Sequence, residues 1–282
     1  MELHNEFQIV GGTCQGRDHK NTNKNSHDAY HWSFDTDLLV AAVSDGCGSG
    51  EHSEVGAKIG VRIMVEEIVR HVRKAAEPGS FAPSIDTMRI ILTRAKKSAN
   101  AKLQVLSDAM GGSHSRNISN YFLFTVVGLL VCEKATFTFC AGDGMVAVNG
   151  KTTVIDEGRS PNYMSYDLVE TDLPRAGTDI EVIEMRATED VQSVMLATDG
   201  INYLAKACES KIPGKDELVG PVSQFWTEDR FFKNPFALTH RLNLINRESQ
   251  TIDHVRKVIN TEHGHLMDDT TIVVVRRKVR KP

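Results

Sequence analysis

Apolar residues recur at steps of three and four along two long segments in the first half of the chain. This spacing places them on one face of a helix, so the sequence predicts helices over about 54–74 and 85–110. Ser84 is suited to cap the start of the second helix, and Gly111-Gly112 is suited to end it. Pro78-Gly79 breaks the chain between the two. The pattern therefore predicts two helices in direct succession.

Shorter runs of β-branched and aromatic residues predict strands around these helices. They lie at 29–34, 37–44, 121–132, 135–141, 145–148, 151–155, 193–198 and 270–275. Asn149-Gly150 favours a tight hairpin, and Glu133-Lys134 favours another, so we expect a largely antiparallel sheet. Between about 205 and 265 the pattern indicates helix and loop, with helices predicted around 237–245 and 252–259. Without repeats or a linker, the chain is predicted to form one α+β domain over 1–282.

Composition excludes several classes of protein. The 33 Lys and Arg against 37 Asp and Glu give a net charge of -4, which does not favour a nucleic-acid partner. No apolar run reaches the roughly 20 residues that span a bilayer, so no membrane association is expected. The start of the chain, MELHNEFQIVGG, lacks the pattern of a signal peptide, and we expect a cytoplasmic protein. Five scattered cysteines indicate neither a disulfide framework nor a thiolate zinc site.

Aspartates stand at the ends of the predicted strands in a repeated and directional way. Three strands end in an Asp-Gly pair, and two others begin just after an aspartate. One such pair alone is more often a simple turn. Because neighbouring antiparallel strands run in opposite directions, however, the end of one lies beside the start of the next. We therefore expect one sheet edge to carry Asp45, Asp143 and Asp199 from strand ends, and Asp28, Asp268 and Asp269 from strand starts.

Such a cluster of carboxylates requires a counter-charge. Two carboxylates about 4 Å apart repel by about 4 kcal/mol at an effective dielectric near 20. Oxygen ligands on loops suit Mg²⁺ or Mn²⁺, whereas zinc prefers Cys and His. Two such ions can share a hydroxide and direct it at a phosphorus atom. The pattern predicts hydrolysis of a phosphate ester.

In this order, the aspartate motifs resemble those of the PP2C (PPM) family of metal-dependent protein serine/threonine phosphatases of bacterial type. The resemblance covers nearly the whole chain and implies a four-layer αββα fold, a PP2C-like antiparallel β-sandwich flanked by helix pairs. It also implies a phosphorylated protein as substrate and metals in a cleft at one sandwich end. The matching motifs are NSHDAY, SDGCGSGEHSEVGA, AGDGMVAVNG, ATDGI and DDTTIVVV.

The resemblance implies a role for each residue of these motifs. Asp45 would bridge two Mn²⁺ or Mg²⁺ ions, and Gly46 would offer its carbonyl oxygen to the second ion. Asp199 and Asp268 would hold the first ion, and Asp28 would orient the water bound there. The nucleophile would be the hydroxide between the two metals, so no phosphoenzyme is expected.

The sequence departs from the family pattern around these residues. Asp143, with Asp199, is similar to the pair that holds a looser third ion, but Gly144 replaces the usual serine after it. Asp269 stands where an asparagine is usual and adds negative charge. The segment RSPNYMSYD, at 159–167, lies where many members place a flap that faces the substrate.

A further departure concerns the residue that grips the phosphate. Most members place an arginine five residues before the first aspartate, and this position is Asn23 here. Arg17, His19 or Lys24 could take its place, and His19 could equally be a structural residue of the loop. The alternative to an enzyme is thus a regulatory or interaction module that keeps the fold but turns over poorly.

Two other patterns in the sequence suggest different kinds of site. The glycine-rich loop 46–50 lacks the glycine spacing of a dinucleotide fold, and Asp45 would repel a pyrophosphate there. His263 and His265 with Asp268 could form a mixed zinc site, although two histidines in a polar loop are more often solvated.

Overall fold

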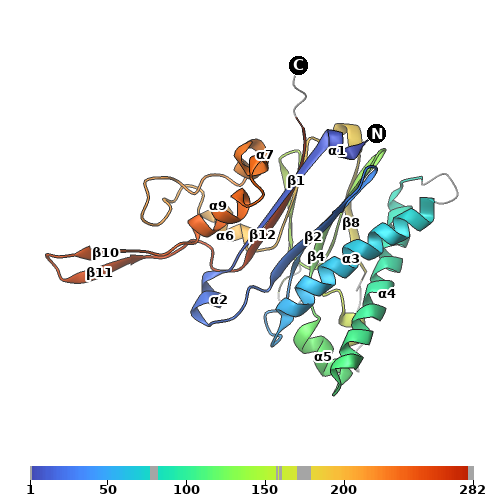
Figure 1. Ribbon diagram of the computed structural model, residues 1–282, viewed down its shortest axis with the longest axis horizontal. Coiled ribbons are helices and arrows are strands. Elements are labelled where there is room, and N and C mark those ends of the chain that lie inside the picture. Colours follow the sequence, from blue (N-terminus) through green and yellow to red (C-terminus); the bar gives the residue numbers. More distant parts are fainter. Residues whose placement is uncertain (1, 77–81, 157, 159–160, 170–178, 279–282) are drawn as a thin grey trace.

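Two five-stranded antiparallel sheets packed face to face form the centre of the molecule (Figure 1). The computed structural model describes residues 2–76, 82–156, 158, 161–169 and 179–278. The β12 sheet has the order β1 (Phe7–Cys14), β12 (Thr270–Arg277), β9 (Ser193–Ala197), β6 (Gly144–Val148) and β7 (Lys151–Ile155). The β3 sheet has the order β2 (Asp28–Phe34), β3 (Leu38–Asp45), β4 (Val126–Cys132), β5 (Ala135–Ala141) and β8 (Glu181–Ala187).

The central strands bury both of their faces. In β3, Leu39 and Val43 point into the core between the two sheets, while Val40 packs on the opposite side against the helices. In β12, Val273 and Val275 likewise face the other sheet. This double burial explains why these strands read as continuous apolar runs and not as alternating ones.

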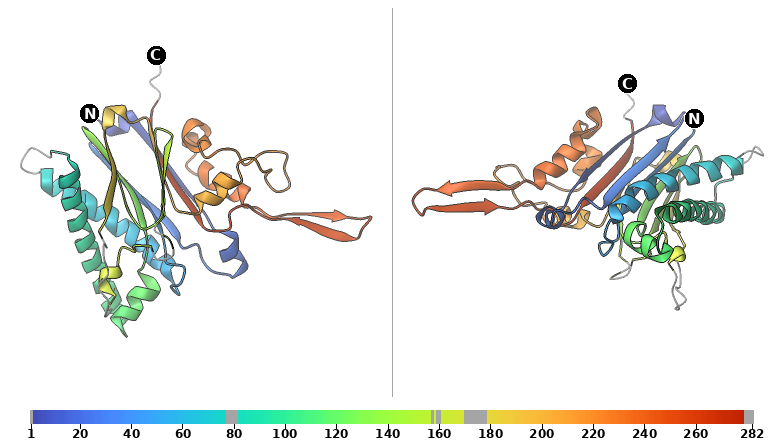
Figure 2. Two further views of the ribbon diagram at one scale, coloured as in Figure 1. Left: turned by 180° about the vertical axis from the view of Figure 1, so that it is seen from behind. Right: turned by 60° about the horizontal axis from the view of Figure 1, so that its bottom comes forward.

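Two long helices cover the outer face of the β3 sheet, as the sequence predicts (Figure 2). They are α3 (Ser53–Ala76) and α4 (Ile85–Met110), and the shorter α5 (His114–Tyr121) follows them. The Oγ of Ser84 accepts a hydrogen bond from the N–H of Thr87 at 3.1 Å and caps α4. Gly111, with φ at 72°, follows its last residue. Pro78-Gly79 lies outside the described residues.

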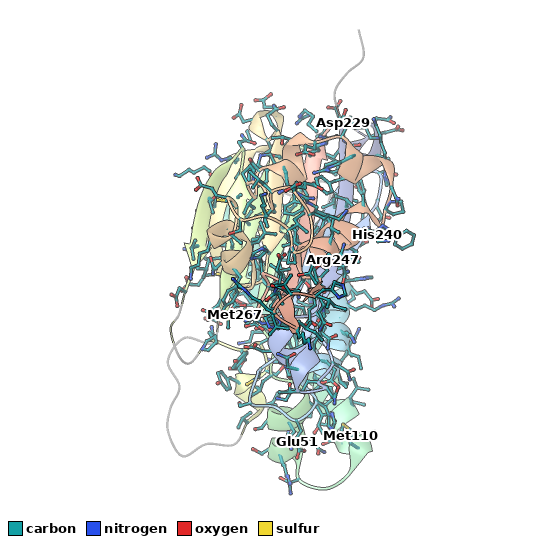
Figure 3. All side chains as sticks on the ribbon, turned by 90° about the vertical axis from the view of Figure 1, so that its left-hand side faces the viewer. Glu51, Met110, Asp229, His240, Arg247 and Met267 are labelled. Carbon is teal, nitrogen blue, oxygen red and sulfur yellow. The ribbon has the colours of Figure 1, made fainter. Side chains whose placement is uncertain are left out.

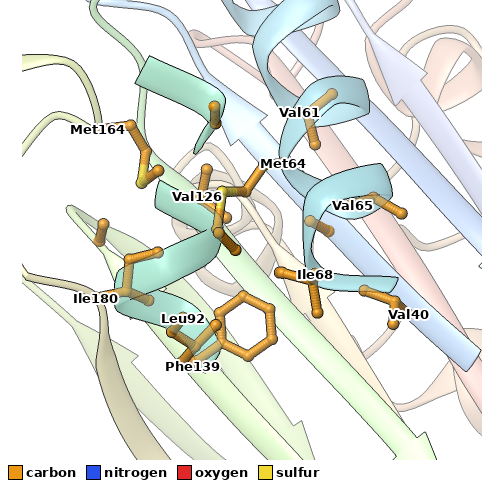
Figure 4. Close-up of a cluster of buried hydrophobic side chains, with 14 of the residues drawn as sticks. Val40, Val61, Met64, Val65, Ile68, Leu92, Val126, Phe139, Met164 and Ile180 are labelled. Carbon is orange, nitrogen blue, oxygen red and sulfur yellow. The ribbon is translucent and has the colours of Figure 1, made fainter. Parts of the chain in front are cut away.

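Apolar side chains fill the space between these helices and the sheet (Figure 4). Met64 and Ile68 of α3 meet Leu92 of α4 over Phe139 of β5, and all four are fully buried. Burying side chains of this size contributes about 1.5–3 kcal/mol each. This packing fixes α3, which begins eight residues after Asp45, relative to the end of β3.

A buried acid also joins the two long helices. Glu67 of α3 is almost fully buried, and its carboxylate accepts hydrogen bonds from Arg70 Nε and from Lys102 Nζ of α4, each at 2.8 Å. Burial alone would raise its pKa, but the bonds from these two cations outweigh burial and hold the pKa of Glu67 below its ordinary value. The ion pair therefore stabilises the α3–α4 packing.

Short helices cover the outer face of the β12 sheet. Their apolar side chains, with Phe225 and Leu242 fully buried, pack on β12 and β9 and complete the four-layer αββα fold. A series of short helices stands on this side in place of a long pair. They are α6 (Ile201–Lys206), α7 (Gln224–Thr227), α8 (Arg230–Lys233) and α9 (Ala237–Ile245). Two small helices, α1 (Leu3–Glu6) and α2 (Arg17–Asn21), flank β1, and 3-10 turns occur at Tyr166–Leu168 and Thr188–Asp190. None of the helices in the described ranges is both long and apolar enough to cross a membrane.

The helix predicted around 252–259 is wrong. This segment forms a hairpin of β10 (Ser249–Asp253) and β11 (Val258–Glu262), which projects from the body of the molecule (Figures 1 and 2). Four turn residues join the strands, and Lys257 adopts a φ of 56°. The apolar residues at 252, 255, 258 and 259 are β-branched and prefer extended backbone when no helix-sized partner surface is present.

The sequence pattern also missed β1 and β8. Gly11 and Gly12 interrupt the apolar run of β1, and both are required by close packing. A Cβ on Gly11 would lie 2.8 Å from the ring of Trp32, and one on Gly12 would lie 2.5 Å from the side chain of Leu238. β8 is an edge strand with many exposed residues, so its pattern is weak.

Candidate metal centre

The ends of two paired strands bring the first two aspartates together. Asp28 is the first residue of β2, Asp45 is the last residue of β3, and the two stand opposite each other in the register. The N–H of Asp45 donates to Thr125 Oγ1 at 3.0 Å, and the N–H of Thr125 donates to the carbonyl oxygen of Asp45 at 2.7 Å. The backbone at Asp45 is therefore held at the edge of the sheet.

A threonine hydroxyl links this edge to the other sheet. Thr198 Oγ1 donates to Asp28 Oδ2 at 2.6 Å and accepts a hydrogen bond from the N–H of Thr271 at 3.0 Å. Asp199 follows Thr198 directly after β9, and Asp268 comes just before β12. The same end of the sandwich thus receives aspartates from both sheets.

The glycines that follow the aspartates allow close approach of other chain segments. A Cβ on Gly46 would lie 2.6 Å from the carbonyl oxygen of Ser53, at the start of α3. A Cβ on Gly200 would lie 1.9 Å from the carbonyl oxygen of Asp269. Because any other residue would push these segments apart, the Asp-Gly pairs are part of how the cluster is assembled and not simple turns.

Gly144 explains one departure from the family pattern. Its φ is 151°, and a Cβ at this position would lie 2.6 Å from the side chain of Val127 and 2.7 Å from the carbonyl oxygen of Ala197. A serine would collide with both neighbours. Asp143, just before it, is close enough to Asp199 to raise the pKa of that residue.

The electrostatics of the aspartates show how closely they are gathered. Burial raises the pKa of Asp28, which is 3% exposed, well above its ordinary value. The pKa of Asp45 is raised in the same way by burial and then by the charges of Asp28, Asp199 and Asp268. The pKa of Asp199 is raised to about 6, first by burial and then by Asp268 and Asp143. Each carboxylate is thus destabilised in its charged form by the others.

The oxygen atoms of these residues are suitable ligands for a divalent cation. Their side chains, however, do not surround a common point. Among the described residues, no three His, Cys, Asp or Glu side chains converge on a single point at ligand distance. The donor set consists of oxygen atoms with an excess of negative charge, which is the set that Mg²⁺ and Mn²⁺ prefer. Electrostatic repulsion between the carboxylates is what a bound cation would remove.

Asp269 contacts residues 16–27 through its carboxylate, which the sequence alone does not indicate. Its Oδ1 accepts from the N–H of Gly16 at 2.6 Å, and its Oδ2 accepts from the N–H of His27 at 2.5 Å and contacts His19 Nδ1 at 2.8 Å. Asp269 is 2% exposed, so these bonds stand in place of water. The carboxylate fastens residues 16–27 to the start of β12.

The three candidate phosphate-binding residues occupy different places. His19 is held by Asp269, and its ring centroid lies 4.3 Å from that of His27. Lys24 is exposed and close enough to His27 to help burial lower the pKa of that histidine. Arg17 instead donates from Nη1 to the carbonyl oxygen of Gly264 at 3.3 Å.

Sequence reasoning missed Tyr163, which lies next to the cluster. Burial raises the pKa of its phenol, and a hydrogen bond with Cys47 and the charge of Asp45 add to the effect. The neighbouring residue Met164 donates its N–H to the carbonyl oxygen of Phe124 at 2.9 Å, and Phe124 forms a β-bridge with Gly46, so this segment is held beside Gly46. The apolar and aromatic residues at 163, 164 and 166 within a mostly polar segment were the signal available in the sequence.

Comparison with known proteins agrees with the fold of this chain. A sequence profile described as protein phosphatase 2C matches residues 15–243. A bacterial serine phosphatase of known structure has a TM-score of 0.53 at 13% identity, covering 98% of this chain and 100% of the other. The serine/threonine phosphatase Stp1 from Staphylococcus aureus has a TM-score of 0.52 at 12% identity, covering 97% and 96%.

The photosystem II phosphatase PBCP is also similar, with a TM-score of 0.51 at 13% identity over 96% of this chain and 99% of the other. No curated protein matches the sequence. At these identities the solved structures show the fold, which agrees with the αββα fold predicted from the sequence. The profile covers most of the chain, and this protein belongs to the protein phosphatase 2C family.

Proposed function

We propose that this protein is a metal-dependent phosphoprotein phosphatase that hydrolyses phosphoserine and phosphothreonine. One observation carries the proposal: carboxylates from separate chain segments are gathered at one end of the sandwich, where Asp28 is buried and Asp45 and Asp199 are half-buried, and neighbouring carboxylates add to burial in raising the pKa values of Asp45 and Asp199. Burying several like charges costs stability unless a cation balances them. The same residues occupy the positions of the family's metal motifs.

The proposed metal ligands are Asp45 between two Mn²⁺ or Mg²⁺ ions, the carbonyl oxygen of Gly46, and the carboxylates of Asp199 and Asp268. When bound, the ions would supply Lewis acidity and a nucleophile derived from water. We assign to Asp28 the orientation of that water; the hydrogen bond that its Oδ2 accepts from the hydroxyl of Thr198 at 2.6 Å supports this by fixing the carboxylate.

We assign the remaining site residues by position. Asp143, which interacts with Asp199, is the proposed ligand of a third and weaker ion. His19 and Lys24 are proposed to contact the substrate phosphate. His19 uses Nδ1 toward Asp269, which leaves Nε2 for a further contact. Arg17 is the weakest of the three candidates, because its guanidinium contacts the backbone of Gly264.

The test is hydrolysis of a phosphoserine or phosphothreonine peptide with and without Mn²⁺. We expect turnover that requires the metal, and a loss of at least about 100-fold in Asp45→Asn and Asp199→Asn. Asp216→Asn is the matched control, because that side chain is 99% exposed, and it should keep full activity. Metal-independent turnover, or equal activity in all three variants, would contradict the proposal.

A second candidate function is a regulatory or interaction module with poor turnover. It is favoured by Asn23, which stands where the family places its phosphate-gripping arginine and adopts a φ of 54°. For this candidate, calorimetry would show Mn²⁺ binding that is lost in Asp45→Asn, but the peptide would not be hydrolysed. Turnover that falls in Lys24→Ala would exclude it.

A further inference from the structure

The β10–β11 hairpin is an arm that extends from the body of the protein (Figures 1 and 2). Figure 3 views the molecule from the side on which the arm projects. Arg247, which precedes the arm in the sequence, and Met267, which follows it, are labelled near the middle of the view. All five residues of β11 are exposed, and those in the middle of β10 are exposed as well. Among the described residues, β10 and β11 pair only with each other, so each has an unpaired outer edge.

This arm carries apolar side chains with no cover. Ile252 and Ile259 stand opposite each other in the register, and each is 64% exposed. Val255 in the turn is 92% exposed, and Val258 is 45% exposed. A two-stranded hairpin is marginally stable alone in water, and exposed edges with apolar residues favour pairing with another strand. The arm therefore has the features of an interaction surface.

Charge is distributed unevenly along the arm. Its base carries the acidic residues Glu248 and Glu262 beside one basic residue, Arg247, whereas its tip carries the basic residues Arg256 and Lys257 beside one acidic residue, Asp253. The side chain of Arg256 is 82% exposed, and its guanidinium lies 3.9 Å from the carboxylate of Asp253, which also accepts the backbone N–H of Arg256 at 2.9 Å. An acidic or a basic partner strand would match only one end of the arm. A second arm in antiparallel orientation matches both ends, because its tip then lies beside the base of the first.

We propose that the hairpin is a dimerisation arm in which β11 pairs in antiparallel fashion with β11 of a second copy of this chain. The two-fold axis would pass through Ile259, so that Ile259 faces Ile259 of the second copy. With this register, Arg256, in the turn just before β11 of each copy, comes next to Glu262 of the other, whose Oε2 also accepts a hydrogen bond from the N–H of Gly214 at 2.8 Å. These cross-strand ion pairs and the apolar pair favour the same register.

Pairing in this register would also bring the exposed isoleucines of the two copies together. The two hairpins form one four-stranded sheet, and Ile252, Ile259 and their counterparts in the second copy make a continuous apolar row across one face. The outer edge of β11 gains backbone hydrogen bonds at the same time. A single strand from each copy gives a small interface, so we expect a reversible dimer at micromolar concentrations.

The test is the molar mass of the full chain, measured by light scattering or sedimentation between about 1 and 200 μM. The chain has a mass of 31.2 kDa, and we expect the measured mass to double with rising concentration. Ile259→Lys should remain monomeric throughout, because two ammonium groups would meet at the axis. Val105→Lys on α4 is the matched control, since Val105 is 67% exposed outside the arm, and it should dimerise like the natural sequence.

Charge exchange tests the register itself. Arg256→Glu alone and Glu262→Arg alone should each weaken dimerisation at least about tenfold, and the double variant should regain it. Circular dichroism and a thermal melt confirm that each variant is folded. A monomer at every concentration, dimerisation that survives Ile259→Lys, or failure of the double variant to regain dimerisation would each overturn the proposal. It does not depend on the proposed phosphatase activity.

Discussion

Replacing Asp199 by asparagine should stabilise the protein when no metal is present. In the folded protein the pKa of Asp199 lies at about 6, against an ordinary value of 3.8. A pKa shift of about two units corresponds to about 3 kcal/mol, and partial exposure and a lost backbone hydrogen bond reduce the gain to about 1–2 kcal/mol.

The pH dependence follows from the direction of this shift. Because the folded-state pKa is raised, the charged carboxylate destabilises the native state at pH values above about 6. The penalty declines as the pH falls below 6 and vanishes near about pH 3, below the ordinary value of 3.8, where the group is protonated in the folded and unfolded states alike. Asp199→Asn should therefore be more stable than the natural sequence at pH 7.5 in EDTA, and equal to it near about pH 3.

Bound Mn²⁺ should make the natural sequence more stable than Asp199→Asn, the reverse of the order without metal. Saturation at about 100 times the dissociation constant adds about 2.7 kcal/mol to a protein that binds the metal only when folded. The natural sequence should gain this amount with Mn²⁺, and Asp199→Asn should gain much less. Urea unfolding followed by circular dichroism measures each difference, with Asp216→Asn as the exposed control. If Asp199→Asn is less stable than the natural sequence in EDTA at pH 7.5, the argument from charge repulsion is wrong.

Three further predictions concern stability and use the same urea assay. Asp269→Asn should cost about 1–3 kcal/mol, because an amide cannot accept all three bonds and leaves a buried N–H such as that of His27 without an acceptor; equal stability would contradict the assigned role. Glu67→Gln should cost about 1–2 kcal/mol at pH 7. Since the folded-state pKa of Glu67 is lowered, this cost should disappear as the pH falls below about 4.5, and a cost that persists at pH 3 would refute the ion-pair argument. Ser84→Ala should cost about 1 kcal/mol through loss of the cap on α4, whereas Ser84→Asp should retain most of the stability.

The sequence predicted the parts of the fold whose patterns are local. The two long helices and the buried strands were found because each repeats its apolar pattern over many residues. The hairpin at 249–262 was mistaken for a helix, because residues 252, 255 and 259 fit a helical spacing while their β-branched shapes favour a strand. β1 was missed because Gly11 and Gly12 interrupt its apolar pattern. They leave room for groups that are distant in the sequence, namely the aromatic rings of β2 and the helix α9.

The candidate site was predictable only in outline. The directional placement of aspartates indicated that they meet at one end of the sheets, and the mutual effects on their pKa values agree with that expectation. The three bonds of Asp269 and the position of Tyr163 join segments more than 100 residues apart. No local pattern encodes such contacts, because each partner alone is an ordinary loop residue.

The position of β12 has a consequence for synthesis of the chain. Every strand of the β3 sheet lies within residues 28–187, so this sheet and its two long helices can form early on the ribosome. The other sheet cannot, because β12, the last of its strands in the sequence, stands between β1 and β9. Asp268 and Asp269 arrive with that strand. A nascent chain that does not yet include β12 thus carries Asp28 and Asp45 on a folded sheet, and the acidic cluster is completed only when β12 has been synthesised.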